Sequence, residues 1–395
     1  MQAIPSDQGS IGMKQHCIVI TCFDENQPGY MDFLYRMRAL SKAYRLTVIS
    51  QQAVIQEELL IQQAQYHCIP HRGGKLGWLN YLWKSAAYAR QAKADVVVLL
   101  HSALAPVTLL LGNMPHCLYW NEHPTNLMHM PTGLAPIRQS FTWLLQQLIF
   151  FGAKQASVIL PIGEDHQADL LAHGVSAEKM ELQYMGVADH FARASQQPIS
   201  DDEAATLKLV YTGTVSAARG RDVMLEAMHL VINNSLFHNI HLRIVGASEQ
   251  ELAYCQQKIE QLDLQDHVEV IGRIPGDEVY QYLQMADAAM CIWQPNTWNM
   301  FNPPTKLFEY LVAGLPVLAS NIRTHTRYIE HGETGYIFDY HAQGLAEAIQ
   351  TLNQNKVRLP TLKAQARHAG QRYVWSKLEA SFIASVKRAQ RHAAI

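Results

Sequence analysis

The chain has 395 residues, which is enough for two or three domains with separate cores. Hydrophobic residues make up 48% of it and charged residues 17%, which is typical of a globular protein and excludes a disordered one. The formal charge of −2 lacks the basic surplus of nucleic-acid-binding proteins, so no nucleic-acid partner is expected.

Signals for export or membrane insertion are weak. Residues 1–15 contain no apolar signal core, so secretion is not expected. The apolar run 96–112 is broken by His101, Ser102 and Pro106, which favours a buried strand and a helix over a membrane span. The six cysteines are scattered without the close pairs of a zinc site, which indicates reduced core thiols in a cytoplasmic protein.

Short apolar runs alternate with amphipathic stretches along the first half of the chain. This alternation predicts a parallel sheet that is covered by helices on both faces. Strands are expected at 16–21, 45–50, 66–70, 95–100, 116–120 and 156–161, and helices near 30–42, 76–92, 134–152 and 164–173. A polar stretch at 193–206 then indicates a linker.

The same alternation restarts after this linker. Strands are expected at 207–213, 241–246, 267–272, 288–293, 316–320 and 335–339. The repetition predicts an α/β fold with two doubly wound parallel-sheet domains of similar size. Because ligands of such sheets bind beyond the carboxyl ends of the strands, polar groups that directly follow a strand are the candidates for a site.

Two such groups lie in the first half. Gly29 belongs to the segment after the first strand, where it could let the backbone approach a ligand or simply form a turn. Glu122 and His123 follow the fifth strand and precede a proline. A binding or acid–base role and an ordinary structural histidine both stay open for His123, since the chain has 19 histidines.

The segment 211–228, YTGTVSAARGRDVMLEAM, ends a strand and passes through small residues to Arg219, Gly220 and Arg221 at a helix start. A flexible backbone, a helix N-terminus and a guanidinium together suit a phosphate group. The segment matches neither the dinucleotide-binding fingerprint nor the P-loop. Two arginines that only solvate a helix start are the alternative.

The segment 301–321, FNPPTKLFEYLVAGLPVLASN, predicts a short helix from its prolines to the next glycine, followed by a buried strand. One stripe of this helix carries polar side chains, namely Asn302, Thr305, Lys306 and Glu309. The stripe begins at the helix N-terminus, where an anion would be stabilised. A solvated face with a Lys–Glu pair is the alternative interpretation.

The apolar stretch 141–151, FTWLLQQLIFF, also allows two interpretations. It could lie on a membrane surface, but it lacks the lysine-rich polar face that such helices use. Packing in the core or between domains is therefore expected, and a peripheral membrane contact is the alternative.

The motifs of the second half resemble those of family 4 glycosyltransferases, whose GT-B fold places two Rossmann-like domains on either side of a cleft. The shared motifs are GTVSAARG, PTKLFEY and HGETGYIF, in this order along the chain. The resemblance covers the second half well and the first only in outline. It implies an acceptor-binding domain, a linker, a nucleotide-sugar-binding domain and a final helix that packs back on the first domain, at 1–192, 193–206, 207–372 and 373–395.

The resemblance also implies roles for single residues. The donor diphosphate would be bound by Arg219, Gly220, Thr305 and Lys306. Glu309, the second glutamate of the E-x7-E motif, would hold the ribose hydroxyls and, with His123, count as a catalytic residue. The nucleoside would meet Arg273 and Ile274, and the sugar and acceptor would meet Gly29, Asn302 and Glu122.

Two positions depart from the family pattern. Phe301 stands where the first glutamate of E-x7-E would be, and Thr214 stands where many relatives carry a second diphosphate-binding arginine. Asn302 and Asn299 are the candidates to recognise the sugar hydroxyls instead.

The resemblance implies a glycosyltransferase in polysaccharide biosynthesis that moves a sugar from a nucleotide-sugar to a glycan or lipid-linked acceptor. Retention of configuration, no cofactor and no metal are expected. The alternatives are an epimerase or hydrolase of nucleotide-sugars on the same fold, and a non-catalytic nucleotide-sugar-binding subunit.

Overall fold

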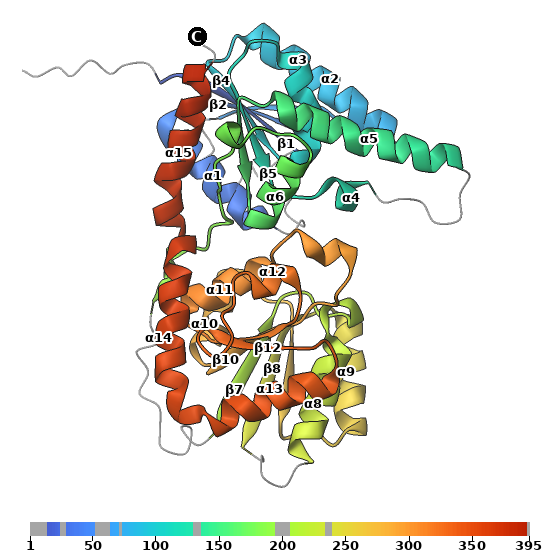
Figure 1. The fold of residues 1–395 in the computed structure, drawn as a ribbon, viewed down its shortest axis with the longest axis vertical. Coiled ribbons are helices and arrows are strands. Elements are labelled where there is room, and N and C mark those ends of the chain that lie inside the picture. Colours follow the sequence, from blue (N-terminus) through green and yellow to red (C-terminus); the bar gives the residue numbers. More distant parts are fainter. Residues whose placement is uncertain are drawn as a thin grey trace, which may run out of the picture.

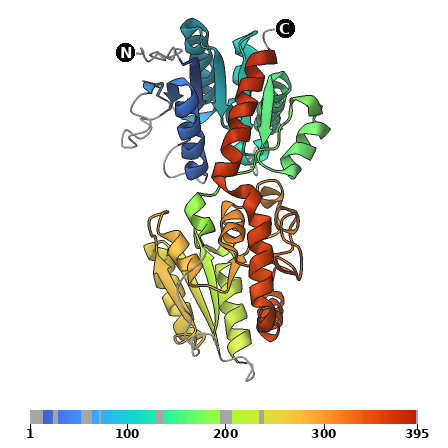
Figure 2. The same ribbon diagram turned by 90° about the vertical axis from the view of Figure 1, so that its left-hand side faces the viewer.

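The computed structural model describes residues 14–23, 29–51, 64–70, 73–128, 136–193, 206–233 and 239–392. They form two α/β units stacked end to end, and a nearly continuous helical segment runs along one side of both (Figure 1, Figure 2). The predicted linker at 193–206 lies outside the described residues except at its two ends.

The first unit is built on a six-stranded parallel sheet with the order β3-β2-β1-β4-β5-β6. Its strands are β1 (His16–Thr21), β2 (Arg45–Ser50), β3 (Gln65–Cys68), β4 (Val96–Leu100), β5 (His116–Trp120) and β6 (Val158–Pro161). Its helices are α1 (Tyr30–Ala43), α2 (Gly74–Ala92), α3 (Thr108–Leu111), α4 (Pro124–Leu127), α5 (Pro136–Gln155) and α6 (Glu164–Ala172). Short 3-10 turns are η1 (Ser102–Val107), η2 (Ala177–Lys179) and η3 (Asp189–Ala192).

The second unit repeats this arrangement with the strand order β12-β11-β10-β7-β8-β9. Its strands are β7 (Leu207–Thr212), β8 (Ile240–Ala247), β9 (Val268–Gly272), β10 (Ala288–Cys291), β11 (Val317–Ser320) and β12 (Gly335–Phe338). Its helices are α8 (Arg221–Ile232), α9 (Glu249–Gln261), α10 (Val279–Gln284), α11 (Thr305–Ala313), α12 (Arg323–Thr326), α13 (Ala342–Gln354) and α14 (Leu359–Gly370). Its 3-10 turns are η4 (Ala217–Arg219), η5 (Thr297–Met300), η6 (Lys356–Arg358) and η7 (Gln371–Tyr373). The predicted fold class, two doubly wound parallel sheets, is confirmed.

Burial explains why these strands form without alternating polarity. Every residue of β4 and β5 is buried, because helices cover both faces of the sheet. In each unit the strand order reverses direction next to the first strand, between β1 and β4 and between β7 and β10. Such a reversal leaves a crevice at the carboxyl ends of the strands, which is where ligands of doubly wound sheets bind.

The last helix, α15 (Trp375–His392), leaves the second unit and packs on the first. Phe382, Val386 and Ala389 join the core that covers one face of the first sheet. Lys42 forms an ion pair with Glu379 at 2.7 Å, so α15 is also tied to α1 at the surface. The chain therefore crosses between the two units twice.

Helix α5 packs on the first sheet along one side only. Its inner side packs in the core through Leu145 and Ile149. Its outer side exposes Trp143, Leu144 and Phe151 to solvent, so the predicted packing in the core is confirmed for one side of this stretch. No helix among the described residues is long and apolar enough to span a membrane.

Candidate active site

The loop after β7 brings a guanidinium to the switch point of the second sheet. Gly213 adopts a φ of 105° and Gly220 a φ of 78°, a left-handed backbone that favours glycine. A Cβ at Gly220 would also clash with Ile292, which follows β10. This close approach seats Arg219 with its guanidinium 4.2 Å from the ring centroid of Trp293.

The nearby Arg221 is already paired with carboxylates. Arg221 forms ion pairs with Asp222 at 2.9 Å and with Glu251 at 2.6 Å, and its guanidinium lies 3.6 Å from the ring centroid of Tyr254. Its charge is thus balanced inside the second unit. Arg219 shows no ion pair among the described residues, so of the two arginines it is the one available for an anion.

The N-terminus of α11 lies against this loop. Pro304 precedes the helix, and no side chain caps its first N–H groups. The Lys306 side chain lies against the backbone of this loop. A Cβ atom placed on Gly213 would be only 3.1 Å from the Lys306 Nζ atom. That Nζ atom lies 3.7 Å from the ring centroid of Tyr211 and has no hydrogen-bond partner among the described residues.

Burial sets the ionisation of both charged residues on α11. It lowers the pKa of Lys306 to about 7, and the positive charge of Arg219 adds to that effect. Burial raises the pKa of Glu309 to about 7, against the opposing influence of Lys306. The two form no ion pair within 4 Å of each other, so the sequence-based alternative of a solvated Lys–Glu pair does not describe this helix. A buried ammonium without a hydrogen-bond or ion-pair partner is unfavourable until an anion binds beside it.

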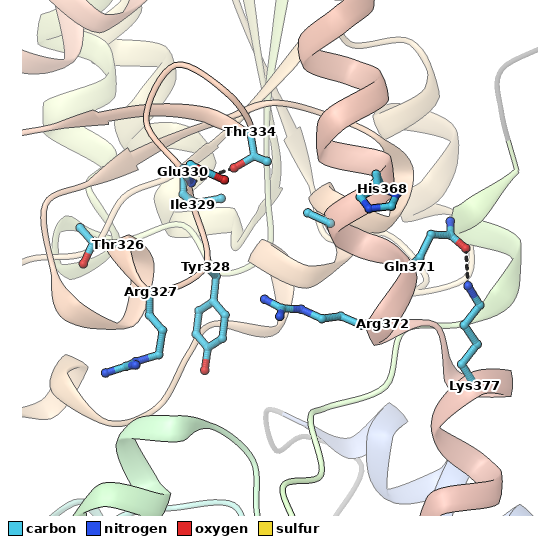
Figure 3. A pocket seen from close by; sticks show the side chains of 11 residues that line it. Thr326, Arg327, Tyr328, Ile329, Glu330, Thr334, His368, Gln371, Arg372 and Lys377 are labelled. Atoms are coloured by element: carbon cyan, nitrogen blue, oxygen red, sulfur yellow. Dashed lines mark hydrogen bonds between the residues drawn. The ribbon is translucent and has the colours of Figure 1, made fainter.

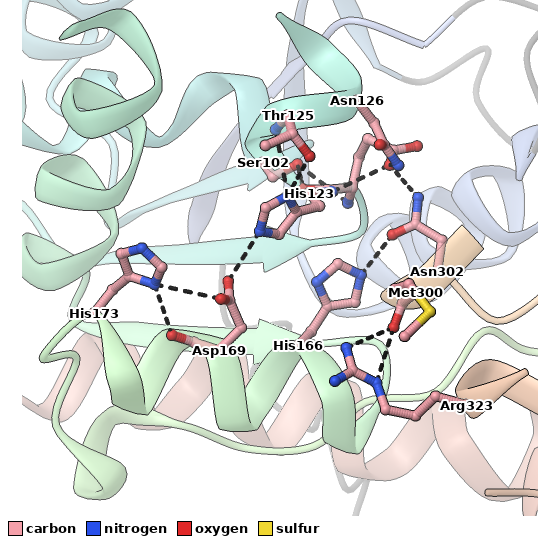
Figure 4. A network of polar contacts seen from close by, with 11 residues as sticks. Ser102, His123, Thr125, Asn126, His166, Asp169, His173, Met300, Asn302 and Arg323 are labelled. Atoms are coloured by element: carbon pink, nitrogen blue, oxygen red, sulfur yellow. Dashed lines mark hydrogen bonds and ion pairs between the residues drawn. The ribbon is translucent and has the colours of Figure 1, made fainter. Parts of the chain in front are cut away.

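The opposing face of the site comes from the end of β5. His123 starts α4, and its Nδ1 atom accepts a hydrogen bond from the N–H of Thr125. This leaves the Nε2 proton to face Asp169 of α6 at 3.2 Å (Figure 4). Asp169 also lies 3.4 Å from Nδ1 of His173. His123 is buried, and both of its ring nitrogens are engaged.

Residues 301 and 302 connect the two units at this point. The Phe301 ring stacks on the His123 ring with centroids 4.0 Å apart and planes 7° from parallel. Asn302 donates a hydrogen bond to Oε1 of Glu122 and accepts one from Nε2 of His166 at 2.7 Å (Figure 4). Burial raises the pKa of Glu122, although Asn126, Asn302 and the His123 N–H oppose this by donating hydrogen bonds to its carboxylate. The structure thus brings Glu122, His123 and Asn302 together.

The other sequence-predicted residues lie in different surroundings. The Thr305 hydroxyl faces the sulfur of Met185 at 3.7 Å, which leaves the backbone of α11 to meet an anion. Gly29 starts α1 with a φ of 85°, but residues 24–28 before it are outside the described part of the chain. After β9, Arg273 is exposed and Ile274 half-buried. No hydrogen bond or ion pair among the described residues joins Gly29, Arg273 or Ile274 to the groups above.

Sequence reasoning missed the contribution of α6. His166, Asp169 and His173 recur at i, i+3 and i+7, a spacing that places them on one helix face after the end of β6. That spacing was the available signal. Burial lowers the pKa of His166 to about 3, and the nearby positive charge of Arg323 adds to that effect, so the His166 ring is neutral where it meets Asn302. Asn299, the other candidate for sugar recognition, is buried and donates to the carbonyl of Gln294, which assigns its side chain to the local turn.

A cavity of about 750 Å³ lies elsewhere, where the 326–334 segment faces η7 and the start of α15 (Figure 3). Arg372 and Lys377 line it, but Arg372 stacks on Tyr184 and Tyr373, and Lys377 donates to Gln371. The described residues contain no group of three or more His, Cys, Asp or Glu side chains that could hold a metal ion.

Comparison with known families accounts for the second unit. Residues 195–372 match the family model described as Glycosyl transferases group 1. The second unit of the chain is therefore similar to the group 1 glycosyl transferases. The matched region contains the Arg219 loop and α11, and the 193–206 region marks its beginning.

The individual relatives are distant in sequence. The amylovoran biosynthesis glycosyltransferase AmsK of Erwinia amylovora is 26% identical over 215 residues, which cover 54% of this chain and 51% of that protein. A D-inositol 3-phosphate glycosyltransferase of Pseudarthrobacter chlorophenolicus is 22% identical over 76% of this chain and 79% of its own length. The match thus spans about half the length of AmsK and more of the second relative.

Solved structures show the same fold over nearly the whole chain. HepE of Anabaena, crystallised with UDP, aligns with a TM-score of 0.73 at 15% identity and covers 94% of this chain and 99% of its own. WaaG, a glycosyltransferase involved in lipopolysaccharide biosynthesis, aligns with a TM-score of 0.67 at 16% identity and covers 93% and 98%. The two units are therefore arranged as in GT-B glycosyltransferases.

Proposed function

We propose that this protein is a glycosyltransferase that moves a sugar from a nucleotide-sugar to a sugar or lipid-linked acceptor in polysaccharide biosynthesis. One observation carries the proposal. The charge of Arg219 lies close enough to act on Lys306, which belongs to the uncapped first turn of α11 at the switch point of the second sheet, and the buried Nζ atom of Lys306 has no hydrogen-bond partner among the described residues. Two cations and free backbone N–H groups in one crevice suit a diphosphate.

The same groups suggest how the reaction proceeds. When the bond between the sugar and the diphosphate breaks, negative charge develops on the phosphate oxygen, next to Arg219 and Lys306. Fixed cations and helix-terminal N–H groups in a crevice stabilise such charge without having to reorganise. The acceptor oxygen bonds to the sugar, and its proton passes to the departing phosphate. Transfer on the face that the phosphate leaves would retain the configuration of the sugar.

The transferred sugar would lie between the two units, where His123, Glu122 and Asn302 meet. In this structure the Phe301 ring covers His123, and Asn302 bonds to the first unit. A bound sugar would have to exchange these contacts for its own hydroxyl groups. Neutral His166 and the carboxylate of Glu122 offer a donor and an acceptor for that exchange.

A titration of nucleoside diphosphates tests the proposal first, and UDP is the first probe because HepE has been crystallised with UDP and with UDP-glucose. Calorimetry with UDP, GDP and ADP should identify one base that binds more tightly than the corresponding monophosphate. The matching nucleotide-sugars are then incubated with and without sugar acceptors. Glycosylated product supports the proposal, whereas free sugar alone or an epimerised donor identifies a hydrolase or an epimerase.

One observation favours a second candidate. Phe301 replaces an acidic residue at the sugar site and closes over His123, so the chain could bind a nucleotide-sugar without turning it over. Saturable donor binding with no product across the acceptor panel would assign it to this non-catalytic class.

A further inference from the structure

Helices α2 and α5 expose an unusual amount of apolar surface. Of the twelve large apolar side chains that are exposed among the described residues, six lie on these two helices, between 42% and 78% exposed. They are Leu76, Trp83, Phe141, Trp143, Leu144 and Phe151. Single exposed apolar residues need no explanation, but a concentration of aromatic and leucine side chains marks an interaction surface.

The two helices form one surface. Both contribute to the core that covers the same face of the first sheet, through Trp78 and Leu82 of α2 and through Ile149 of α5. The Lys75 ammonium donates to the Thr142 hydroxyl, so the two helices also touch directly. They lie on the side of the first unit away from α15 (Figure 1).

All charged residues on α2 and α5 are positive. Helices α2 and α5 contain five Lys or Arg residues and no Asp or Glu, while the whole chain has a formal charge of −2. On α2, Leu76, Trp83 and Arg90 recur at seven-residue spacing and therefore lie on one stripe. Apolar and cationic side chains are thus interleaved on the same outer face. Helix α5 has only two of these five cationic residues, too few for a basic membrane-binding helix, and α2 supplies the other three.

We propose that the α2/α5 surface docks this protein onto an anionic lipid bilayer. Tryptophan, phenylalanine and leucine side chains enter the boundary between headgroups and acyl chains, and lysines and arginines beside them pair with lipid phosphates. A second copy of the chain is a poor occupant. In a two-fold dimer the same patch would meet itself and bring together cations with no carboxylates on either helix.

The position of the surface adds a functional consequence, which rests on the proposed transferase activity. Phe150 of α5 stacks on His173 at 3.6 Å and its ring edge meets His123, so α5 adjoins the first-unit half of the site. A groove of about 390 Å³ next to it is lined by Leu144, Phe151 and Lys154 among others. A bilayer on this side would present lipid-linked acceptors to that half of the site.

Co-sedimentation with vesicles tests the docking surface on the full-length protein. The wild type should bind vesicles that contain phosphatidylglycerol and bind pure phosphatidylcholine vesicles much less. A triple variant, Trp143→Gln, Leu144→Gln and Phe151→Gln, should lose about tenfold or more of this binding. A matched control, Leu230→Gln with Met285→Gln, removes similarly exposed apolar side chains from the second unit and should bind as the wild type does.

The charges are tested separately. Lys84→Gln with Arg90→Gln should weaken binding to anionic vesicles by about fivefold per charge removed, the factor that about 1 kcal/mol per cation represents. Equal binding to both vesicle types, or a triple variant that binds like its control, would overturn the proposal. The proposal would also be overturned if the wild-type protein does not bind vesicles but forms dimers in sedimentation velocity runs, and the triple variant does not form them. Vesicle binding needs no nucleotide-sugar, so this test is independent of the transferase proposal, and an unchanged Tm and circular dichroism spectrum show that each variant is folded.

Discussion

Replacing Lys306 with methionine separates ligand binding from folding stability. Methionine keeps most of the apolar stem that lies against Tyr211 and removes the ammonium. If this ammonium contacts the donor diphosphate, the variant loses a charge-assisted hydrogen bond of about 1.5–3 kcal/mol. The dissociation constant of the nucleoside diphosphate should therefore rise roughly 10- to 150-fold.

The stability of the empty protein should move in the opposite direction. Burial lowers the pKa of Lys306 from 10.5 to about 7, so the folded state disfavours the ammonium that the unfolded chain carries. This penalty is full below pH 7 and disappears as the pH approaches 10.5. Removing about 1 kcal/mol of it would raise the Tm by roughly 2–4 °C at neutral pH.

The assay pairs calorimetry with thermal unfolding at pH 7 and again near pH 10. The expected result is weaker nucleotide binding together with a higher Tm at pH 7, and a smaller Tm difference near pH 10. A variant that binds the nucleotide as the wild type does would refute the diphosphate site. A lower Tm at pH 7 would refute the argument that the ammonium is buried without a partner.

Three further outcomes follow from the same site. Arg219→Ala should weaken nucleotide binding about as much as the Lys306 variant. Arg221→Ala should mainly lower the Tm, because its guanidinium pairs with carboxylates. Equal losses of nucleotide binding in the two arginine variants would contradict the assignment of different roles to them. Glu309→Gln should weaken binding of a ribose donor but not of a 2′,3′-dideoxy donor. The ratio of wild-type to variant affinity should fall below pH 7, because the Glu309 carboxyl, with a pKa of about 7, takes up its proton there, whereas Lys306 gains its proton in both proteins. Turnover should survive a chelator, and its loss with recovery on adding manganese would place a metal in the reaction.

Local patterns were sufficient to predict the sheets. Continuous apolar runs such as 96–100 indicate strands buried on both faces, and the regular alternation with helical stretches predicts two parallel sheets. The start of α11 was also readable, because Pro304 and the polar stripe after it lie within one short segment. These features depend on neighbours a few residues away.

Contacts between distant segments were not readable. Arg219 and Arg221 look equivalent in the sequence, and only the approach of α9 and its Glu251 shows which one is already paired. The bond between His166 and Asn302 joins residues 136 positions apart in different units. The exposed apolar side of α5 indicates a membrane-binding surface only once the fold places it next to the lysines of α2. In each case tertiary packing, not local preference, decides the role.

A crystal structure with the best-binding nucleoside diphosphate tests the central claim most directly. The account predicts its phosphates within hydrogen-bond distance of the Arg219 guanidinium, of Nζ of Lys306 and of the first N–H groups of α11. Phosphates bound anywhere else, such as the cavity beside Arg372 and Lys377, would contradict the assignment of the donor site.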